Sequence, residues 1–140
     1  CTKAGMRITA VTPEVNPASR DDELLEEARG TGLFHETLDI KEVAPEADFI
    51  YTDTWIDMEF FFDQSYEEEK NRRIQTFEPY QINEALLETT DAYMMHCLPA
   101  HKGYEVTSGV MKAKQCIAVD QAENRMHAQK AVLLRLMDRG

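Results

Sequence analysis

The sequence has no excess of basic residues and no long hydrophobic run, and these two absences exclude several classes of protein. Its formal net charge is −11, with 15 Lys and Arg residues against 26 Asp and Glu residues. A nucleic-acid-binding chain needs a basic face for the phosphates, so no nucleic-acid partner is expected. No apolar run approaches the roughly 20 residues of a membrane span, and no basic-then-apolar signal segment is visible. The sequence therefore predicts no association with a membrane.

Cysteine is scarce as well. The three cysteines are Cys1, Cys97 and Cys116. An odd number with no paired spacing predicts reduced thiols and a cytoplasmic location. No C-x2-C pair is present, and neighbouring side chains on a strand point to opposite faces, so the scattered histidines and cysteines make a poor zinc site. We expect no metal.

A glycine-rich phosphate loop is also missing. No G-x-G-x-x-G segment follows any predicted strand, and that loop is what would hold the pyrophosphate of a dinucleotide. The sequence therefore does not support a dinucleotide cofactor, although its pattern of strands and helices is compatible with that class of fold.

Short β-rich runs alternate with helical segments along the whole chain. The runs that predict strands are 6–11, 33–37, 47–51, 92–95 and 116–119. This alternation is typical of an α/β fold, a doubly wound and mostly parallel sheet with helices on both faces. At 140 residues the chain is expected to form one domain. It starts at Cys1 without an initiator methionine, and we expect that domain to be truncated at its N-terminus.

Two helices can be described in more detail from their residues. Ser19 is the expected N-cap of a helix over 19–28, with acidic residues in the first turn. The last helix is predicted over 121–137, with an apolar stripe expected to face the core. The residues of that stripe are Ala128, Val132, Leu133 and Met137.

Residues with useful chemistry follow three of the predicted strands. Asp53 follows the strand over 47–51, Cys97 follows the strand over 92–95, and Arg125 lies in the segment after the last strand. Each has an ordinary explanation by itself: a solvated turn aspartate, a buried small thiol, and a surface arginine paired with Glu123. The carboxyl ends of parallel strands meet at one edge of a sheet, where such folds bind small molecules. The three residues are therefore expected to share one cleft.

Three motifs resemble those of ornithine carbamoyltransferases. The segment His96-Cys97-Leu98-Pro99, followed by Lys102-Gly103 and Glu105-Val106-Thr107, resembles their H-C-L-P…R/K-G-x-E-V-T segment. Residues 122–131 (AENRMHAQKA) and 51–55 (YTDTW) resemble two further motifs of the family, in the same order. The resemblance covers nearly the whole chain. It implies the second, amino-acid-binding domain of a transcarbamylase, without its opening strand and without the carbamoyl-phosphate domain.

The resemblance also implies a reaction and residue roles. The δ-amine of ornithine would attack carbamoyl phosphate to give citrulline and phosphate, with no cofactor, in a homotrimeric enzyme of arginine biosynthesis. Asp53 would anchor the α-ammonium of ornithine, Cys97 would orient the reacting groups, and Arg125 would stabilise the carbonyl oxygen as it gains charge. The Leu98 carbonyl, aimed by a cis Leu98–Pro99 bond, would accept from the carbamoyl NH2. The residues implied in substrate binding are Asp53, Asp57, Met58, His96, Cys97, Leu98 and Arg125, and Cys97 and Arg125 are the implied catalytic residues.

One segment departs from the family pattern. Ornithine enzymes carry Ser-Met-Gly where this chain reads Asp57-Met58-Glu59. An added carboxylate would repel the α-carboxylate of ornithine by about 4 kcal/mol at 4 Å and an effective dielectric constant of 20. Two alternatives therefore stay open: a related transcarbamylase for another amine such as putrescine, and a non-catalytic α/β fragment. In every case we expect the isolated chain to be inactive.

Overall fold

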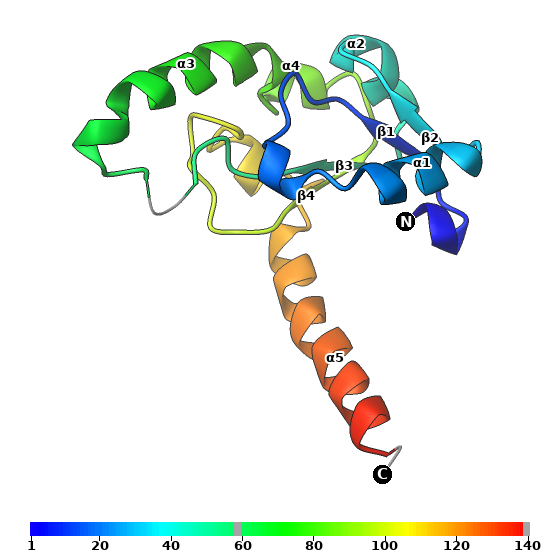
Figure 1. Cartoon of the computed structure of the whole chain (residues 1–140). Coiled ribbons are helices and arrows are strands. Elements are labelled where there is room, and N and C mark those ends of the chain that lie inside the picture. The colour runs from blue at the N-terminus through cyan, green and yellow to red at the C-terminus, as the bar shows by residue number, and fades with distance from the viewer. Residues whose placement is uncertain (58–59, 139–140) are drawn as a thin grey trace. The chain divides into compact units, whose positions relative to one another are not determined.

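The computed structural model describes residues 1–57 and 60–138. They divide into two compact units, Cys1–Val43 and Ala44–Gly140, each built around a pair of parallel strands (Figure 1). The alternation of parallel strands with helices confirms the α/β class predicted from the sequence. No helix among the described residues is both long enough and apolar enough to cross a membrane.

The first unit is a strand–helix–strand arrangement. Strand β1 (Ile8–Ala10) leads through helix α1 (Asp22–Gly30) to strand β2 (Phe34–Glu36), and Ile8 pairs with Phe34 in a parallel register. Helix α2 (Ile40–Val43) follows and ends before Pro45, which cannot continue a regular helix.

Helix α1 begins later than the sequence suggested. Asp21 is its N-cap, and the Asp21 Oδ1 accepts from the Leu24 backbone N–H at 3.0 Å. The prediction of Ser19 as the cap is wrong: Ser19 belongs to a short 3-10 helix and donates its hydroxyl to the Asn16 carbonyl at 2.9 Å. Both residue types are good caps, so composition alone did not decide between them.

The second unit places β4 in the middle of three extended segments. Strand β3 (Phe49–Thr52) runs parallel to β4 (Tyr93–His96) on one side. On the other side, the Met94 N–H donates to the Gln115 carbonyl at 2.8 Å and the Met94 carbonyl accepts from the Ile117 N–H at 2.9 Å. Helix α3 (Glu67–Phe77) and helix α4 (Glu84–Leu87) lie in the connection from β3 to β4, and helix α5 (Ala118–Met137) follows the third segment.

The core of this second unit surrounds β4. Its fully buried apolar side chains are those of Ile56, Met94, Val106, Val110 and Ala118. The chain on either side of β4 is tied to this core, since the Ile82 N–H donates to the Glu105 carbonyl at 3.0 Å. The carboxyl ends of β3 and β4 therefore adjoin the buried core of this unit.

The predicted strand over residues 116–119 is wrong. Only Cys116 bridges to Met94, and α5 already begins at Ala118. A four-residue apolar run is too short for its period to separate a strand from the first turn of a helix.

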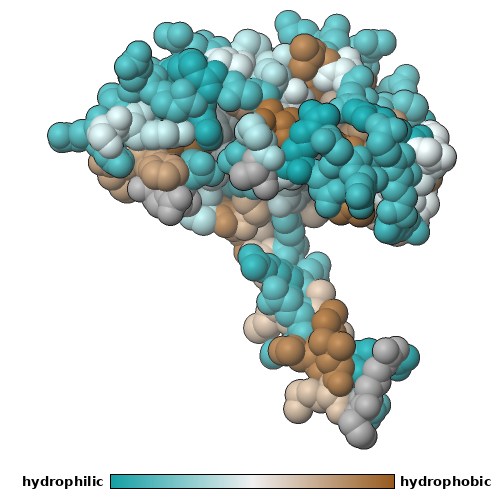
Figure 2. All heavy atoms as spheres, viewed as in Figure 1, coloured by the Kyte–Doolittle hydropathy of each residue, from teal (hydrophilic) through white to brown (hydrophobic). Residues whose placement is uncertain are grey.

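The apolar stripe of α5 is exposed rather than buried. The exposed fractions of Val132, Leu133 and Met137 are 57%, 59% and 77%, and no described residue covers this stripe. Hydrophobic side chains gather along the C-terminal half of α5 in Figure 2. Helical periodicity identifies which face is apolar, but it does not supply the surface that covers that face.

Candidate functional site

The ends of β3 and β4 bring Asp53 and Cys97 into contact. Thr52 pairs with His96 in the parallel register, so the next residue of each strand leaves the sheet at the same edge. The Cys97 Sγ donates to the Asp53 Oδ1 at 2.8 Å. This is the meeting of strand ends that the sequence predicted for these two residues.

Asp53 keeps one carboxylate oxygen available. Its Oδ1 accepts from the Thr54 N–H at 2.7 Å as well as from the Cys97 thiol. The Oδ2 receives no hydrogen bond from any residue that the structure describes, and the residue is exposed. An ionised carboxylate oxygen of this kind can accept a charge-assisted hydrogen bond from an ammonium group.

Cys97 is held as a neutral thiol. Burial, and then the hydrogen bond to Asp53 and its charge, raise the pKa of Cys97 to about 11. The thiolate is the nucleophilic form of cysteine, so at neutral pH this side chain donates a hydrogen bond rather than attacking a substrate.

Tyr51 and Gln121 extend this cluster, and neither was predicted as a site residue. Burial, followed by the neighbouring Cys97, raises the pKa of Tyr51, and a side-chain contact with Gln121 partly offsets that effect. Tyr51 lies on β3, two residues before Asp53, and its place in the segment 51–55 is the signal that could have revealed it. Gln121 lies in the first turn of α5, within the segment 120–125 that was expected to approach the cleft, but only Arg125 of that segment was predicted as a site residue.

The ring of His96 is engaged on both of its nitrogens. Its Nε2 lies 3.2 Å from the Glu105 Oε1, and its Nδ1 accepts from the Leu98 N–H at 2.8 Å. The side chains of His96 and Glu105 are both fully buried. The predicted contact of His96 with substrate stays a prediction, and its ring serves first to connect β4 to the following loop.

The loop after Cys97 has an unusual backbone. The Leu98–Pro99 peptide bond is cis, as expected, and Leu98 adopts a left-handed φ of 53°. That φ is uncommon for a residue other than glycine. No described residue donates a hydrogen bond to the Leu98 carbonyl, which leaves this acceptor available.

Arg125 is not joined to Asp53 or Cys97. It lies on α5 and is exposed, and its side chain makes no hydrogen bond or ion pair with any of the described residues. The structure therefore brings together two of the three residues that were expected to share a cleft, and the role of Arg125 stays a prediction.

Asp57 is paired with a cation. Its Oδ2 lies 3.6 Å from the Arg73 Nη1, and the same Arg73 nitrogen donates to the Trp55 carbonyl at 3.4 Å. Arg73 also contacts Glu69, and the hydrogen bonds from Arg72 and then Arg73 lower the pKa of Glu69 to about 2. The predicted contact of Met58 with substrate lies outside the described residues.

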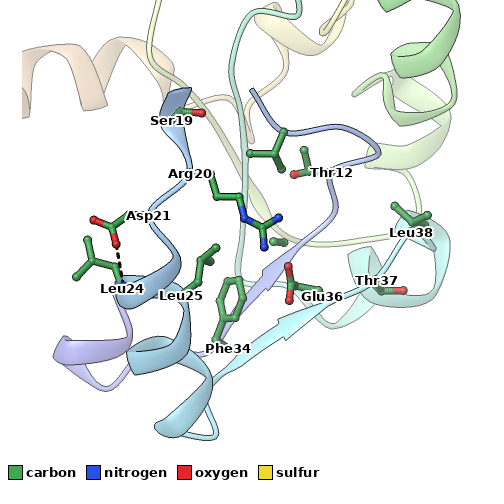
Figure 3. Close-up of a pocket in the computed structure, with 12 residues that line it drawn as sticks. Thr12, Ser19, Arg20, Asp21, Leu24, Leu25, Phe34, Glu36, Thr37 and Leu38 are labelled. Atoms are coloured by element: carbon green, nitrogen blue, oxygen red, sulfur yellow. Dashed lines mark hydrogen bonds between the residues drawn. The ribbon is translucent and has the colours of Figure 1, made fainter. Parts of the chain in front are cut away.

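Two further features bear on the binding of ligands. Within residues 1–57 and 60–138, no three His, Cys, Asp or Glu side chains are grouped so that they could hold a metal ion. A cavity of about 510 Å³ lies in the first unit (Figure 3). Apolar side chains such as Leu25 and Phe34 line it together with Arg20 and Glu36, and it includes none of the predicted site residues.

Comparisons with known proteins agree with the resemblance. A family described as aspartate/ornithine carbamoyltransferase, Asp/Orn binding domain, matches residues 1–136. The ornithine carbamoyltransferase of Oceanobacillus iheyensis is 46% identical over 142 residues, covering 96% of this chain and 42% of that protein. The ornithine carbamoyltransferase of Archaeoglobus fulgidus is 44% identical over 139 residues, covering 95% of this chain and 42% of that protein.

A solved structure extends the agreement to the fold. The ornithine carbamoyltransferase from Pyrococcus furiosus matches with a TM-score of 0.77 and 38% identity, covering 94% of this chain and 42% of that one. The chain therefore spans about 42% of the length of these relatives.

Proposed function

The chain belongs to the aspartate/ornithine carbamoyltransferase family, and on that premise we propose that it forms the amine-binding half of a carbamoyltransferase that acts on ornithine. In this reaction the δ-amine nitrogen of ornithine forms a bond to the carbonyl carbon of carbamoyl phosphate. The bond from that carbon to the phosphate oxygen breaks, and the amine loses a proton. The products are citrulline and phosphate.

The contact between Asp53 and Cys97 carries this proposal. It places an aspartate with an available Oδ2 beside a neutral thiol, at the sheet edge where α/β folds bind ligands. Asp53 anchors the α-ammonium of ornithine through that oxygen. Cys97 orients the reacting amine, because a thiol with a pKa of about 11 is not a nucleophile at neutral pH.

The remaining roles concern the carbamoyl group. The Leu98 carbonyl accepts from the carbamoyl NH2, and Arg125 stabilises the carbonyl oxygen as negative charge develops on it. Asp57 and Met58 contact the amino-acid head of ornithine. No covalent intermediate and no cofactor takes part, so positioning and electrostatics supply the rate enhancement.

The pairing of Asp57 with Arg73 bears on the choice of amine. A carboxylate compensated by a guanidinium 3.6 Å away repels the ornithine carboxylate less than an unpaired one does. This contact, together with relatives that are named ornithine carbamoyltransferases, favours ornithine over putrescine.

Broader features of the proposal rest on the family resemblance alone. They are a second domain that binds carbamoyl phosphate, a homotrimeric assembly, a cytoplasmic location and a place in arginine biosynthesis. The chain corresponds to the ornithine-binding domain, and we expect it to be inactive when isolated because the carbamoyl-phosphate site is on the other domain.

Product formation tests the proposal. The complete gene product that contains these residues is supplied with carbamoyl phosphate and either ornithine or putrescine, and citrulline or carbamoylputrescine is measured. Citrulline as the main product, abolished or strongly reduced by Arg125→Ala, is the expected result. Preference for putrescine would overturn the choice of amine, and no transfer to either amine would overturn the proposed function.

A further inference from the structure

A fully buried carboxylate lies beneath the loop that carries Cys97 and Leu98. The Glu105 Oε1 accepts from the His101 backbone N–H at 2.5 Å and lies 3.2 Å from the His96 Nε2. Its backbone is fixed as well, because the Glu105 carbonyl accepts from the Ile82 N–H. One oxygen atom thus holds both ends of the loop from His96 to His101.

The hydrogen bonds of His96 define which of its nitrogens carries the proton. Nδ1 accepts from the Leu98 N–H at 2.8 Å, so this nitrogen offers its lone pair to that bond and carries no hydrogen. A neutral imidazole has its single hydrogen on the other nitrogen, and Nε2 therefore donates to the Glu105 carboxylate. In the opposite tautomer the hydrogen would be on Nδ1, where it would face the Leu98 N–H. Nε2 would then have no hydrogen to donate to Glu105.

This chain of hydrogen bonds ends at a residue with an uncommon backbone. Leu98 has a φ of 53°, which is sparsely populated for a leucine and persists only where the surroundings hold it. The Leu98 N–H is held by His96, and His96 is held by Glu105. Removing the last acceptor frees the ring of His96 to change tautomer, and with it the direction of the Leu98 peptide.

We propose that Glu105 is a positioning residue: it fixes His96 in the Nε2–H tautomer, and through it the orientation of the Leu98 backbone beside Cys97. The link to catalysis rests on the proposed function, in which the Leu98 carbonyl and the Cys97 thiol contact the reacting groups. The tautomer itself does not depend on that function and can be measured directly.

Nitrogen NMR of the histidine rings in the 140-residue chain is the first test. In the wild-type chain, His96 is expected to show an unprotonated Nδ1 and a protonated Nε2, assigned by the loss of its signals in His96→Gln. In Glu105→Leu, this pattern is expected to give way to a mixture of tautomers with a shifted Leu98 amide resonance. A protonated Nδ1 in the wild-type chain, or an unchanged pattern in Glu105→Leu, would overturn the proposal.

Glu105→Gln separates positioning from loss of buried structure. The glutamine carbonyl can accept from the same two donors, so the wild-type tautomer should persist even if Glu105→Leu fails to fold. Glu88→Leu is the matched control, because Glu88 is exposed and its side chain has no part in the loop. A folded Glu105→Gln chain with mixed tautomers would contradict the role assigned to the acceptor oxygen.

Kinetics of the complete gene product connect the tautomer to turnover. Leaving the buried His96 N–H without an acceptor is expected to lower kcat by about 10- to 100-fold in Glu105→Leu. The KM for ornithine should change less than threefold, since Asp53 is untouched, and Glu105→Gln should recover most of the rate. An inactive wild-type enzyme would reject the proposed function while leaving the NMR result intact. Full activity in Glu105→Leu would reject the positioning role alone.

Discussion

Cys97 follows Asp53 by 44 positions in the chain, and its thiol donates a 2.8 Å hydrogen bond to the carboxylate of that aspartate. The contact joins the ends of two neighbouring parallel strands. It also ties the ionisation of the thiol to the charge of Asp53, since burial and then Asp53 raise the pKa of Cys97 to about 11. A substitution at Asp53 should therefore change the pKa and the reactivity of the Cys97 thiol.

Replacing Asp53 by asparagine should make Cys97 more reactive. The substitution removes the negative charge that opposes the thiolate, so the pKa of Cys97 should fall towards its ordinary value. Alkylation by iodoacetamide at pH 8.5, followed by mass spectrometry of the Cys97 peptide, should proceed severalfold faster in Asp53→Asn than in the wild-type chain. The exposed Cys1 serves as an internal control, with an unchanged rate expected. Equal rates at Cys97 in the two proteins would contradict the assigned cause.

The same thiol predicts a loss of stability at high pH. The pKa of Cys97 is about 11 in the folded chain against an ordinary value of 9.0, so the folded state retains the proton that the unfolded state releases. The contribution of the Cys97 thiol to the free energy of unfolding is therefore complete below about pH 9, and it decreases as the pH rises from about 9 to about 11. Melting temperatures of the wild-type chain and of Cys97→Ser should be compared at intervals across this range. As the pH rises, the melting temperature of the wild type should fall relative to that of Cys97→Ser. A constant difference would contradict the prediction.

The contact at Asp53 could be predicted, whereas the support beneath it could not. Parallel strands end at one edge of a sheet, so two polar residues that each follow a strand were expected to meet. Glu105 lies nine residues from His96, with a cis peptide bond and a turn between them. No helical or strand period relates these two positions, so only the folded loop shows that they pair.

The end of the chain illustrates a different limit. The period of α5 correctly identified Val132 and Leu133 as members of one apolar stripe, yet both are exposed. Burial requires a second surface, and a sequence pattern does not state where that surface lies. For Asp57 the charge could be read from the sequence but its partner could not, because Arg73 lies 16 positions away and no helical or strand period relates the two residues.

Arg73 should influence the binding of ornithine without touching it. Arg73→Ala leaves the Asp57 carboxylate without its nearby cation and removes the contact with the Trp55 carbonyl. In the complete gene product, the KM for ornithine should rise by about 3- to 10-fold through repulsion of the substrate carboxylate, a range that reflects solvent screening of the half-exposed Asp57. The KM for carbamoyl phosphate should be unchanged.

The double variant Arg73→Ala, Asp57→Asn tests the cause of that effect. Removing the carboxylate should restore the KM for ornithine to within about twofold of the wild-type value, because the repulsion then has no source. Should the double variant keep the raised KM, the effect of Arg73 would belong to the shape of the loop and not to its charge.

Met94 should be one of the most sensitive positions for stability. Its side chain is completely buried on the central segment of the second unit, so Met94→Ala leaves a cavity and should cost about 2–5 kcal/mol of unfolding free energy. Val132→Ala is the matched control on α5, where an exposed fraction of 57% predicts a change within about 0.5 kcal/mol. Urea unfolding followed by circular dichroism would measure both. A large loss for Val132→Ala would show that the α5 stripe is covered in solution.

The two strand pairs should differ in their protection from amide exchange. In the first unit, the Ile8 N–H donates to the Leu33 carbonyl at 2.8 Å, within a sheet of only two strands. None of the described side chains of Cys1–Val43 is fully buried, and a two-stranded sheet is marginally stable without a core behind it. In the second unit, the Met94 N–H makes a bond of the same length, but β4 is flanked on both sides and Met94 is fully buried.

The two hydrogen bonds are equal in length, so burial and flanking segments decide the rate of amide exchange. The amides of β1 should exchange at least tenfold faster than the amide of Met94 under native conditions. Hydrogen–deuterium exchange followed by NMR measures both sites in one sample, and uniformly slow exchange across residues 6–11 would refute the prediction.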